Sequence, residues 1–249
     1  MFWGEPMSRT TGYLGGGQAK QRSGWLIPLA VFFITACLSA LVLAYYFVPE
    51  PVRLAEELPA PTDATRAVAI VGGDTQFRIP ANYLPLASAR QGGASTKIVL
   101  AALLPDFDGY DLGSADAFAD NGPESRVVGI TLHATAVPPP EQQRIERIYS
   151  AQLADKDGKP GPYGFREYAF RADSGYHDQD LFVAQTDAGP AIFLCTKIGP
   201  DVVSPSCMRD VAFTPGLGLS YRFRRAYLKD WRDIDAKARA LVAKFVDKP

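Results

Sequence analysis

The feature that most constrains this chain is a run of 24 residues without a charge, residues 25–48, which reads WLIPLAVFFITACLSALVLAYYFV. As an α-helix the run would extend about 36 Å, more than the ~30 Å hydrocarbon core of a bilayer. Trp25 at one end and Tyr45 and Tyr46 at the other are residue types that favour the membrane–water interface. The run therefore predicts a transmembrane helix, with these three aromatic residues as membrane anchors and the lipid bilayer as its partner.

The charges on either side of the run predict its orientation. Lys20 and Arg22 come just before it, and Glu50 is the first charge after it. Basic residues favour the cytoplasmic side of a membrane. We therefore expect a single-pass protein of the cell inner membrane, with a cytoplasmic N-terminus and a periplasmic C-terminal domain.

Two alternatives to an uncleaved helix stay open. A cleaved signal peptide has a shorter apolar region, typically 7–15 residues, so the length of the run argues against it. The tetrapeptide Ile34-Thr35-Ala36-Cys37 is similar to a bacterial lipobox, in which the cysteine is acylated and becomes the new N-terminus. Residues 38–48 would then leave a strongly apolar start on the mature chain, which favours the uncleaved helix.

The rest of the chain divides at its prolines. Residues 1–24 predict a short cytoplasmic tail, and residues 49–66 form a linker rich in Pro and Glu that is semi-rigid and extended. Residues 67–249 then form the extracytoplasmic domain, whose 183 residues suit one domain with its own core.

Apolar alternation and turn residues predict an α+β domain. It would have a mainly antiparallel sheet and two longer helices, over residues 141–154 and, at the C-terminus, 230–246. The expected strands are residues 67–71, 75–79, 96–104, 126–137, 165–171, 180–186, 191–197, 207–213 and 219–227.

The domain holds two cysteines, Cys195 and Cys207, near the ends of neighbouring expected strands. In an oxidising compartment two such thiols predict a disulfide. The alternative is a pair of free buried cysteines. Neither has a Cys or His at ligand spacing, so we expect no metal and no cofactor.

Each of the two histidines has an ordinary structural interpretation. His133 lies within an expected strand, where a packed or surface histidine is more common than a catalyst. His177 lies in the polar stretch Ser174-Gly175-Tyr176-His177-Asp178, which is also typical of a hairpin turn. A Ser-His-Asp triad is defined by geometry in space, so the sequence leaves an envelope hydrolase open as an alternative only.

A basic stripe follows the last expected strand and its exit. Alternation places Tyr221 and Phe223 inward and the arginines between them outward. The stripe is a candidate interaction surface for an acidic partner or anionic lipid, although a solvated strand face is the simpler interpretation. Its members are Arg222, Arg224, Arg225, Lys229 and Arg232.

Charge balance excludes one class of partner. The net charge is −1, and because residues 1–66 hold equal numbers of each sign, the domain also carries −1. Such a domain gives no electrostatic reason to expect nucleic acid. The order of anchor, linker and domain resembles single-pass proteins of bacterial inner membranes. We expect a non-catalytic binding or scaffold module, or an accessory subunit, whose partner is another membrane or envelope protein.

Overall fold

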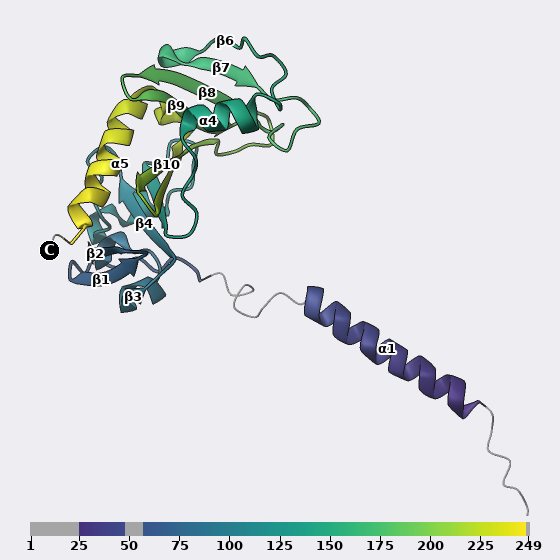
Figure 1. The fold of residues 1–249 in the computed structure, drawn as a ribbon. Coiled ribbons are helices and arrows are strands. Elements are labelled where there is room, and N and C mark those ends of the chain that lie inside the picture. Colours follow the sequence, from purple (N-terminus) through teal and green to yellow (C-terminus); the bar gives the residue numbers. More distant parts are fainter. Residues whose placement is uncertain (1–24, 48–56, 248–249) are drawn as a thin grey trace, which may run out of the picture. The chain divides into compact units, whose positions relative to one another are not determined.

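The computed structural model describes residues 25–47 and 57–247. The tail at 1–24 and the first half of the linker lie outside these residues. The chain divides into two units at Glu56/Glu57. The first unit contains the uncharged helix α1 (Leu26–Phe47), in which side chains are described over residues 27–43 (Figure 1). No helix within the described residues is long and apolar enough to cross a membrane.

The second unit begins with a small sheet. Strands β1 (Ala67–Gly72) and β2 (Thr75–Pro80) form an antiparallel hairpin, and the two-residue β3 (Gly93–Ala94) pairs in parallel with β1. Gly73 in the turn has a φ of 59°, a conformation that glycine adopts without strain. The hairpin was predicted from the sequence, but its separation into a sheet of its own was not.

The remaining strands form one antiparallel sheet in the order β4-β5-β11-β10-β9-β8-β7-β6. Alternating burial along β5 and β11 shows that one face of each strand is packed. The bounds are β4 Lys97–Leu103, β5 Val127–His133, β6 Lys159–Pro160, β7 Arg166–Ala169, β8 Gln179–Thr186, β9 Gly189–Thr196, β10 Ser206–Thr214 and β11 Leu217–Arg224.

The inner face of this sheet carries the main core. The C-terminal helix α5 (Trp231–Phe245) lies along it and buries an apolar stripe that includes Trp231, Ile234 and Val242. The β1–β2 hairpin adds Ile70, Phe77 and other residues to the same core. The inner face is therefore closed by a helix and a second sheet.

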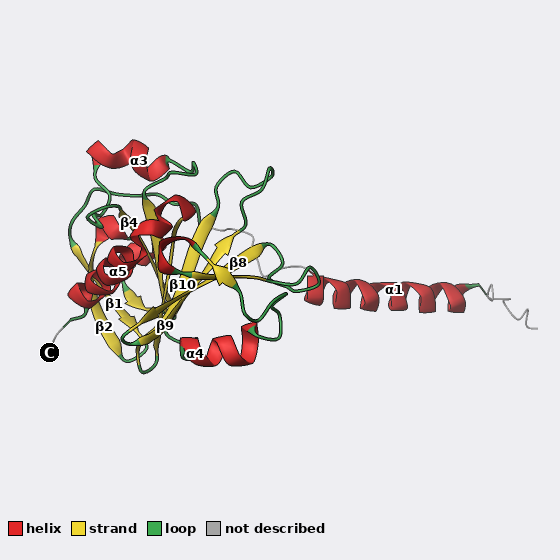
Figure 2. Ribbon diagram, turned by 90° about the horizontal axis from the view of Figure 1, so that it is seen from above, coloured by secondary structure: helices red, strands yellow, loops and turns green. Residues whose placement is uncertain are grey.

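The outer face is covered at one end only. Helix α4 (Glu141–Arg144) continues into a π-helical turn, η4 (Ile145–Tyr149). Tyr149 packs there with Leu181, Val183 and Ile192, which point outward from β8 and β9. Helices α4 and α5 thus lie on opposite faces of the sheet (Figure 2). Over β4, β5, β11 and the first half of β10 the outer face carries no comparable buried cluster among the described residues, although α3 borders it beside β4 and residues 136–138 contact it at Gly218.

Short helices make the connections. Helix α3 (Ala115–Ala119) follows the turn η3 (Leu112–Ser114), in which Asp111 and Ser114 cap each other. The other 3-10 turns are η1 (Ala81–Tyr83), η2 (Ser88–Gln91), η5 (Pro162–Gly164) and η6 (Arg225–Asp230).

The α+β class, the antiparallel strands and the C-terminal helix were predicted correctly. Three elements end earlier than expected. The strand expected over 219–227 ends at Arg224, where η6 begins. The strand expected over 126–137 ends at His133, because Ala134 makes the last ladder bond, to Thr96, before the prolines at 138–140. The helix expected over 141–154 ends at Tyr149, after which Leu153 pairs with Phe170 as an isolated bridge.

Candidate binding face

The uncovered outer face of the large sheet is floored by small side chains. Gly129 and Thr131 of β5 lie opposite Ala101 and Val99 of β4, and on the other side opposite Arg222 and Ser220 of β11. A Cβ atom built on Gly129 would have no atom within 4 Å. The sheet is therefore hollowed here, because the sequence places small residues on the outer positions of its central strands.

The largest hollow on this face is a groove of about 680 Å³ between the sheet and helix α3. Its floor is Val99, Ala101, Val127 and Gly129, and its walls are mainly apolar. Among the described residues that line it, Asp116 of α3 is the one that carries a charge. The wall residues are Pro59, Pro61, Asn82, Pro85, Tyr110, Ala115, Phe118, Ala119 and Asn121. This groove, bounded by the β4 edge and α3, is called the β4 groove below.

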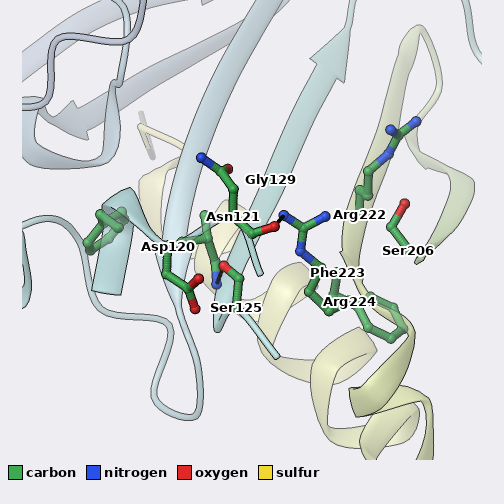
Figure 3. A pocket seen from close by; sticks show the side chains of 10 residues that line it. Asp120, Asn121, Ser125, Gly129, Ser206, Arg222, Phe223 and Arg224 are labelled. Atoms are coloured by element: carbon green, nitrogen blue, oxygen red, sulfur yellow. Dashed lines mark hydrogen bonds between the residues drawn. The ribbon is translucent and has the colours of Figure 1, made fainter. Parts of the chain in front are cut away.

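A smaller hollow of about 170 Å³ adjoins the β4 groove, since both are lined by Phe118, Asn121, Val127 and Gly129. Figure 3 shows Asn121 and Arg224 at one side of it and Arg222 with Ser206 at the other. Arg224 donates to the Asn121 carbonyl at 3.0 Å, and Arg222 reaches the Met208 sulfur at 3.7 Å. Neither guanidinium forms a salt bridge within the described part of the chain.

His133 lines a third hollow, of about 340 Å³, at the other end of the same face. Asp210 and Ser220 line it too, so a hydroxyl, a carboxylate and an imidazole share one concavity. The Ser220 hydroxyl, however, donates to Asp210, and no hydrogen bond joins His133 to either residue. The order of donors therefore differs from that of a Ser-His-Asp triad, in which the serine donates to the histidine.

His177 lies in an exposed loop, as the polar-turn interpretation expects. Its Nδ1 is 3.0 Å from the Ser174 carbonyl oxygen, and its own carbonyl accepts from Lys197. None of the hollows described above includes it. The structure thus places a hydroxyl and a carboxylate in one hollow with His133, whereas His177 lines none of these hollows.

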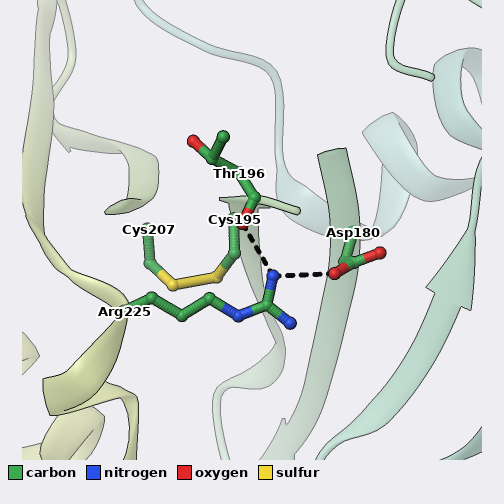
Figure 4. Close-up of a disulfide and its surroundings, with 5 residues drawn as sticks. All are labelled: Asp180, Cys195, Thr196, Cys207 and Arg225. Atoms are coloured by element: carbon green, nitrogen blue, oxygen red, sulfur yellow. Dashed lines mark hydrogen bonds and ion pairs between the residues drawn. A yellow bond between two sulfur atoms is a disulfide. The ribbon is translucent and has the colours of Figure 1, made fainter. Parts of the chain in front are cut away.

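The predicted disulfide joins Cys195 and Cys207, which are direct partners on β9 and β10 with Cα atoms 4.0 Å apart. Figure 4 shows Arg225 beside this bond. The Arg225 guanidinium binds the Asp180 carboxylate at 2.7 Å and the Thr196 carbonyl at 2.7 Å. The Arg225 side chain is thus largely buried and paired with Asp180. It is separate from the outward-facing arginines of β11.

The basic stripe is therefore divided by the fold. Arg222 and Arg224 lie on the open face, as alternation predicted, while Lys229 lies in the last turn of η6 and Arg232 stacks over the Trp231 ring at 4.4 Å. Of the expected membrane anchors, Trp25 is exposed, and the side chains of Tyr45 and Tyr46 lie outside the described residues. Cys37 is a free, exposed thiol on α1.

The strongest electrostatic feature lies on the inner side of the sheet. Burial alone would lower the pKa of the Arg209 guanidinium, but its hydrogen bond to Glu141 raises that pKa above its ordinary value. Asp235 binds the same guanidinium at 2.9 Å. All three charges have partners, so the cluster ties the start of α4, strand β10 and helix α5 together. In the residues searched, no cluster of His, Cys, Asp and Glu is suited to a metal ion.

Comparison with solved structures finds two chains with a similar fold. One is Smlt3025, an immunity protein of the Stenotrophomonas maltophilia type IV secretion system, with 18% identity and a TM-score of 0.52 over 74% of this chain and 94% of that one. The other is the Neisseria meningitidis iron-regulated outer membrane lipoprotein FrpD, with 14% identity and a TM-score of 0.50 over 77% and 98%. At these identities the likeness shows a shared fold.

Comparison with family models finds no match, and no curated protein matches by sequence. The residues that shape the open face were not singled out by sequence reasoning. Gly129 lies in a strand, where glycine is a signal of close approach or of a hollow, and that signal could have found it. Asn82 and Phe118 carry no comparable signal, because the tertiary structure alone brings them to β4.

Proposed function

We propose that residues 57–249 form a non-catalytic protein-binding module of the cell envelope, of the kind that an immunity protein or an accessory subunit provides. One observation carries the proposal: the sheet leaves its outer face partly open over β4, β5 and β11, and two adjoining hollows cross that face, the larger mainly apolar and the smaller lined in part by Arg222 and Arg224. Uncovered concave surfaces of this type are where proteins bind partners and ligands.

The similar solved structures support this choice of class. One is described as an immunity protein and the other as an outer membrane lipoprotein, and neither description is that of an enzyme. Both cover nearly the whole of their own length in the comparison, so the likeness extends over a complete domain. We therefore infer an envelope location for this chain, which is consistent with both descriptions.

We further propose that the whole uncharged run of residues 25–48, which extends beyond the side chains described for α1, anchors the module to the inner membrane as a single-pass helix, with the N-terminus in the cytoplasm and the domain in the periplasm. The apolar run is 24 residues long in the sequence and continues past the end of α1. Large apolar side chains cover α1 on all sides, among them Ile27, Phe32, Phe33 and Leu38. A helix that is apolar all round requires an apolar environment.

The binding role is tested with the full-length chain purified from membranes in mild detergent after cross-linking in cells. We expect one envelope protein to be recovered in stoichiometric amount. The cross-links should map to the open face of β5 and β11. Recovery of the chain as an uncomplexed monomer under these conditions would refute a binding role. Alkali extraction of the same membranes tests the anchor, since a spanning helix stays in the pellet.

A hydrolase is the second candidate, and it is favoured by one observation, the hollow that His133 shares with Asp210 and Ser220. If Ser220 were a nucleophile, a fluorophosphonate probe would label it, and His133→Ala would abolish the labelling. We expect no labelling, because the Ser220 hydroxyl is held by Asp210. Labelling that is lost in both Ser220→Ala and His133→Ala would replace the binding proposal.

Acylation at Cys37 is the alternative form of the anchor. It requires cleavage before Cys37, which would leave Cys37 as the first residue of the mature chain, followed by the apolar residues 38–47 of α1. The intact mass of the purified protein decides between the two. A mass equal to that of the uncleaved chain supports the spanning helix, and a mass that begins at Cys37 plus fatty acids supports the lipoprotein.

A further inference from the structure

Strand β4 is an edge of the large sheet, since β5 is its one neighbour in the order of strands. The hydrogen bonds at its two ends define which residues face β5. Ala134 donates to the Thr96 carbonyl and Leu104 donates to the Arg126 carbonyl. Because bonded pairs alternate along an antiparallel ladder, Ile98, Leu100 and Ala102 face β5. The N–H and C=O groups of the residues between them point to the free edge.

Two of these outward-facing residues are satisfied locally. At one end of β4 the Ser95 hydroxyl donates to the Lys97 carbonyl at 2.8 Å and lies 3.3 Å from the Lys97 amide. At the other end Leu103 and Asp108 exchange both backbone hydrogen bonds, at 2.8 and 3.3 Å. The edge is thus closed at Lys97 and at Leu103.

Between these two ends, Val99 and Ala101 keep outward N–H and C=O groups that bond to no other described residue. The two residues are spaced by about 7 Å, the repeat of an antiparallel ladder. Both also line the β4 groove. The groove therefore presents two hydrogen-bond donors and two acceptors. Their spacing matches the repeat of the N–H and C=O groups along an extended backbone.

One further polar atom lies at this edge. The Asn82 side-chain amide donates to the Tyr110 carbonyl at 3.1 Å, while its Oδ1 atom is buried without a hydrogen-bond partner in the part of the chain described. A buried acceptor left without a donor costs free energy. A backbone or side-chain N–H from an occupant of the groove would supply that donor.

From these observations we propose that the β4 groove binds an extended segment of a partner protein, which adds as a strand to the edge of β4 at Val99 and Ala101. This deepens the proposed binding function and rests on it. Main-chain hydrogen bonds give such strand addition its affinity, and the lining of the groove selects the side chains.

The lining specifies the chemistry of the occupant. The floor of Val99, Ala101, Val127 and Gly129 with walls of proline, tyrosine and phenylalanine accepts small apolar side chains. Asp116, exposed on α3, is the charged residue of the lining, so a Lys or Arg in the segment would complement it. The partner segment is therefore extended, apolar at alternate positions and basic at one position.

The test uses the full-length chain and a phage-displayed library of random peptides of about 10 residues, long enough for one strand. We expect enriched peptides with alternating apolar residues and a Lys or Arg. A synthetic peptide of the enriched sequence should protect the Val99 and Ala101 amide protons from hydrogen exchange. Peptides that bind without protecting these two amides would overturn strand addition and leave the proposed binding function standing.

Two variants and one matched control complete the test. Gly129→Val fills the floor without a clash of its Cβ, and Ala101→Pro removes an outward N–H that the β4–β5 ladder does not use. Each should weaken peptide binding at least tenfold. The control Gly199→Val, also at a glycine with open space, should not weaken it.

Unchanged affinity in folded Gly129→Val would refute the site, as would a selection that enriches no peptide. If two copies of the chain instead dimerise through β4 and exclude the peptide, the occupant of the groove is a second copy of this chain and not a partner protein.

Discussion

Glu141 accepts two parallel hydrogen bonds from the Arg209 guanidinium, 3.0 Å from Nε to Oε1 and 2.8 Å from Nη2 to Oε2. The pair sits where β9 and β10 part, because the two strands are in register at Cys195–Cys207 and Leu194–Met208 and at no later residue of β10. Glu141 also accepts the Ile192 amide at 2.8 Å. The start of α4 thus supplies the acceptor that the departing strand no longer offers.

Glu141→Ala should destabilise the domain strongly. It leaves the nearly buried Arg209 with Asp235 as its remaining carboxylate and removes the acceptor of the Ile192 amide. Removing one partner of a buried ion pair costs about 3–5 kcal/mol of stability. Urea denaturation measures the loss. The matched control is Arg78→Ala, whose salt bridge to Asp247 is exposed and screened by solvent, so that its loss should have a much smaller effect. Equal effects of the two variants would contradict the assignment.

Reduction of the Cys195–Cys207 disulfide should lower the free energy of unfolding by about 3 kcal/mol under the chain-entropy model, since the closed loop is short. The comparison is urea denaturation with and without reductant. In the double variant Cys195→Ala/Cys207→Ala the reductant should make no difference. A reductant effect that persists in the double variant would assign the loss to another group.

The free energy of unfolding should fall at alkaline pH because of the Tyr221 phenol. Burial, together with the nearby Asp235 carboxylate, raises the pKa of its phenol well above the ordinary value of 10. Above pH 10 the unfolded chain therefore loses this proton while the folded chain keeps it, so the contribution is complete below pH 10 and is lost as the pH rises further. Tyr221→Phe should flatten this alkaline decline, as seen in denaturation midpoints measured from pH 8 to 11.

The same substitution has a cost near neutral pH, because the Tyr221 hydroxyl donates to Asp235 at 2.7 Å. Loss of that hydrogen bond should cost about 1 kcal/mol. Tyr163, which is more than half exposed, provides the matched control as Tyr163→Phe. An alkaline decline that is identical in the wild type and Tyr221→Phe would show that other groups cause it.

Gly109→Ala should destabilise the edge of the β4 groove. Its Cβ would lie 2.6 Å from the Asn82 Nδ2 atom and 2.9 Å from the Tyr83 ring. Asn82 is held by its bond to Tyr110, so it has little room to retreat. The crowding should cost about 1–3 kcal/mol in thermal or urea denaturation. Gly175→Ala, at a glycine with open space, should be close to neutral. A neutral Gly109→Ala would mean that this edge adapts freely.

Local patterns in the sequence were enough to predict most of the helices and strands. Apolar alternation and turn residues identified β5, β10 and β11, and an apolar stripe at helical spacing identified α5. The placement of two cysteines at the ends of neighbouring strands was enough for the disulfide. These features depend on residues close together in the chain, and so they can be inferred from periodicity and spacing.

The tertiary structure alone decided what lies over each part of the sheet. Val99 and Ala101 are ordinary strand residues in the sequence. They become a candidate binding edge because Pro59, Pro61, Asn82, Pro85 and α3 assemble around them, while no described strand pairs with β4 on the side away from β5. The pattern of a strand specifies which side chains are buried, but its neighbours specify which backbone groups stay unpaired. Those neighbours are distant in sequence, and so the open edge appears only when the chain is folded.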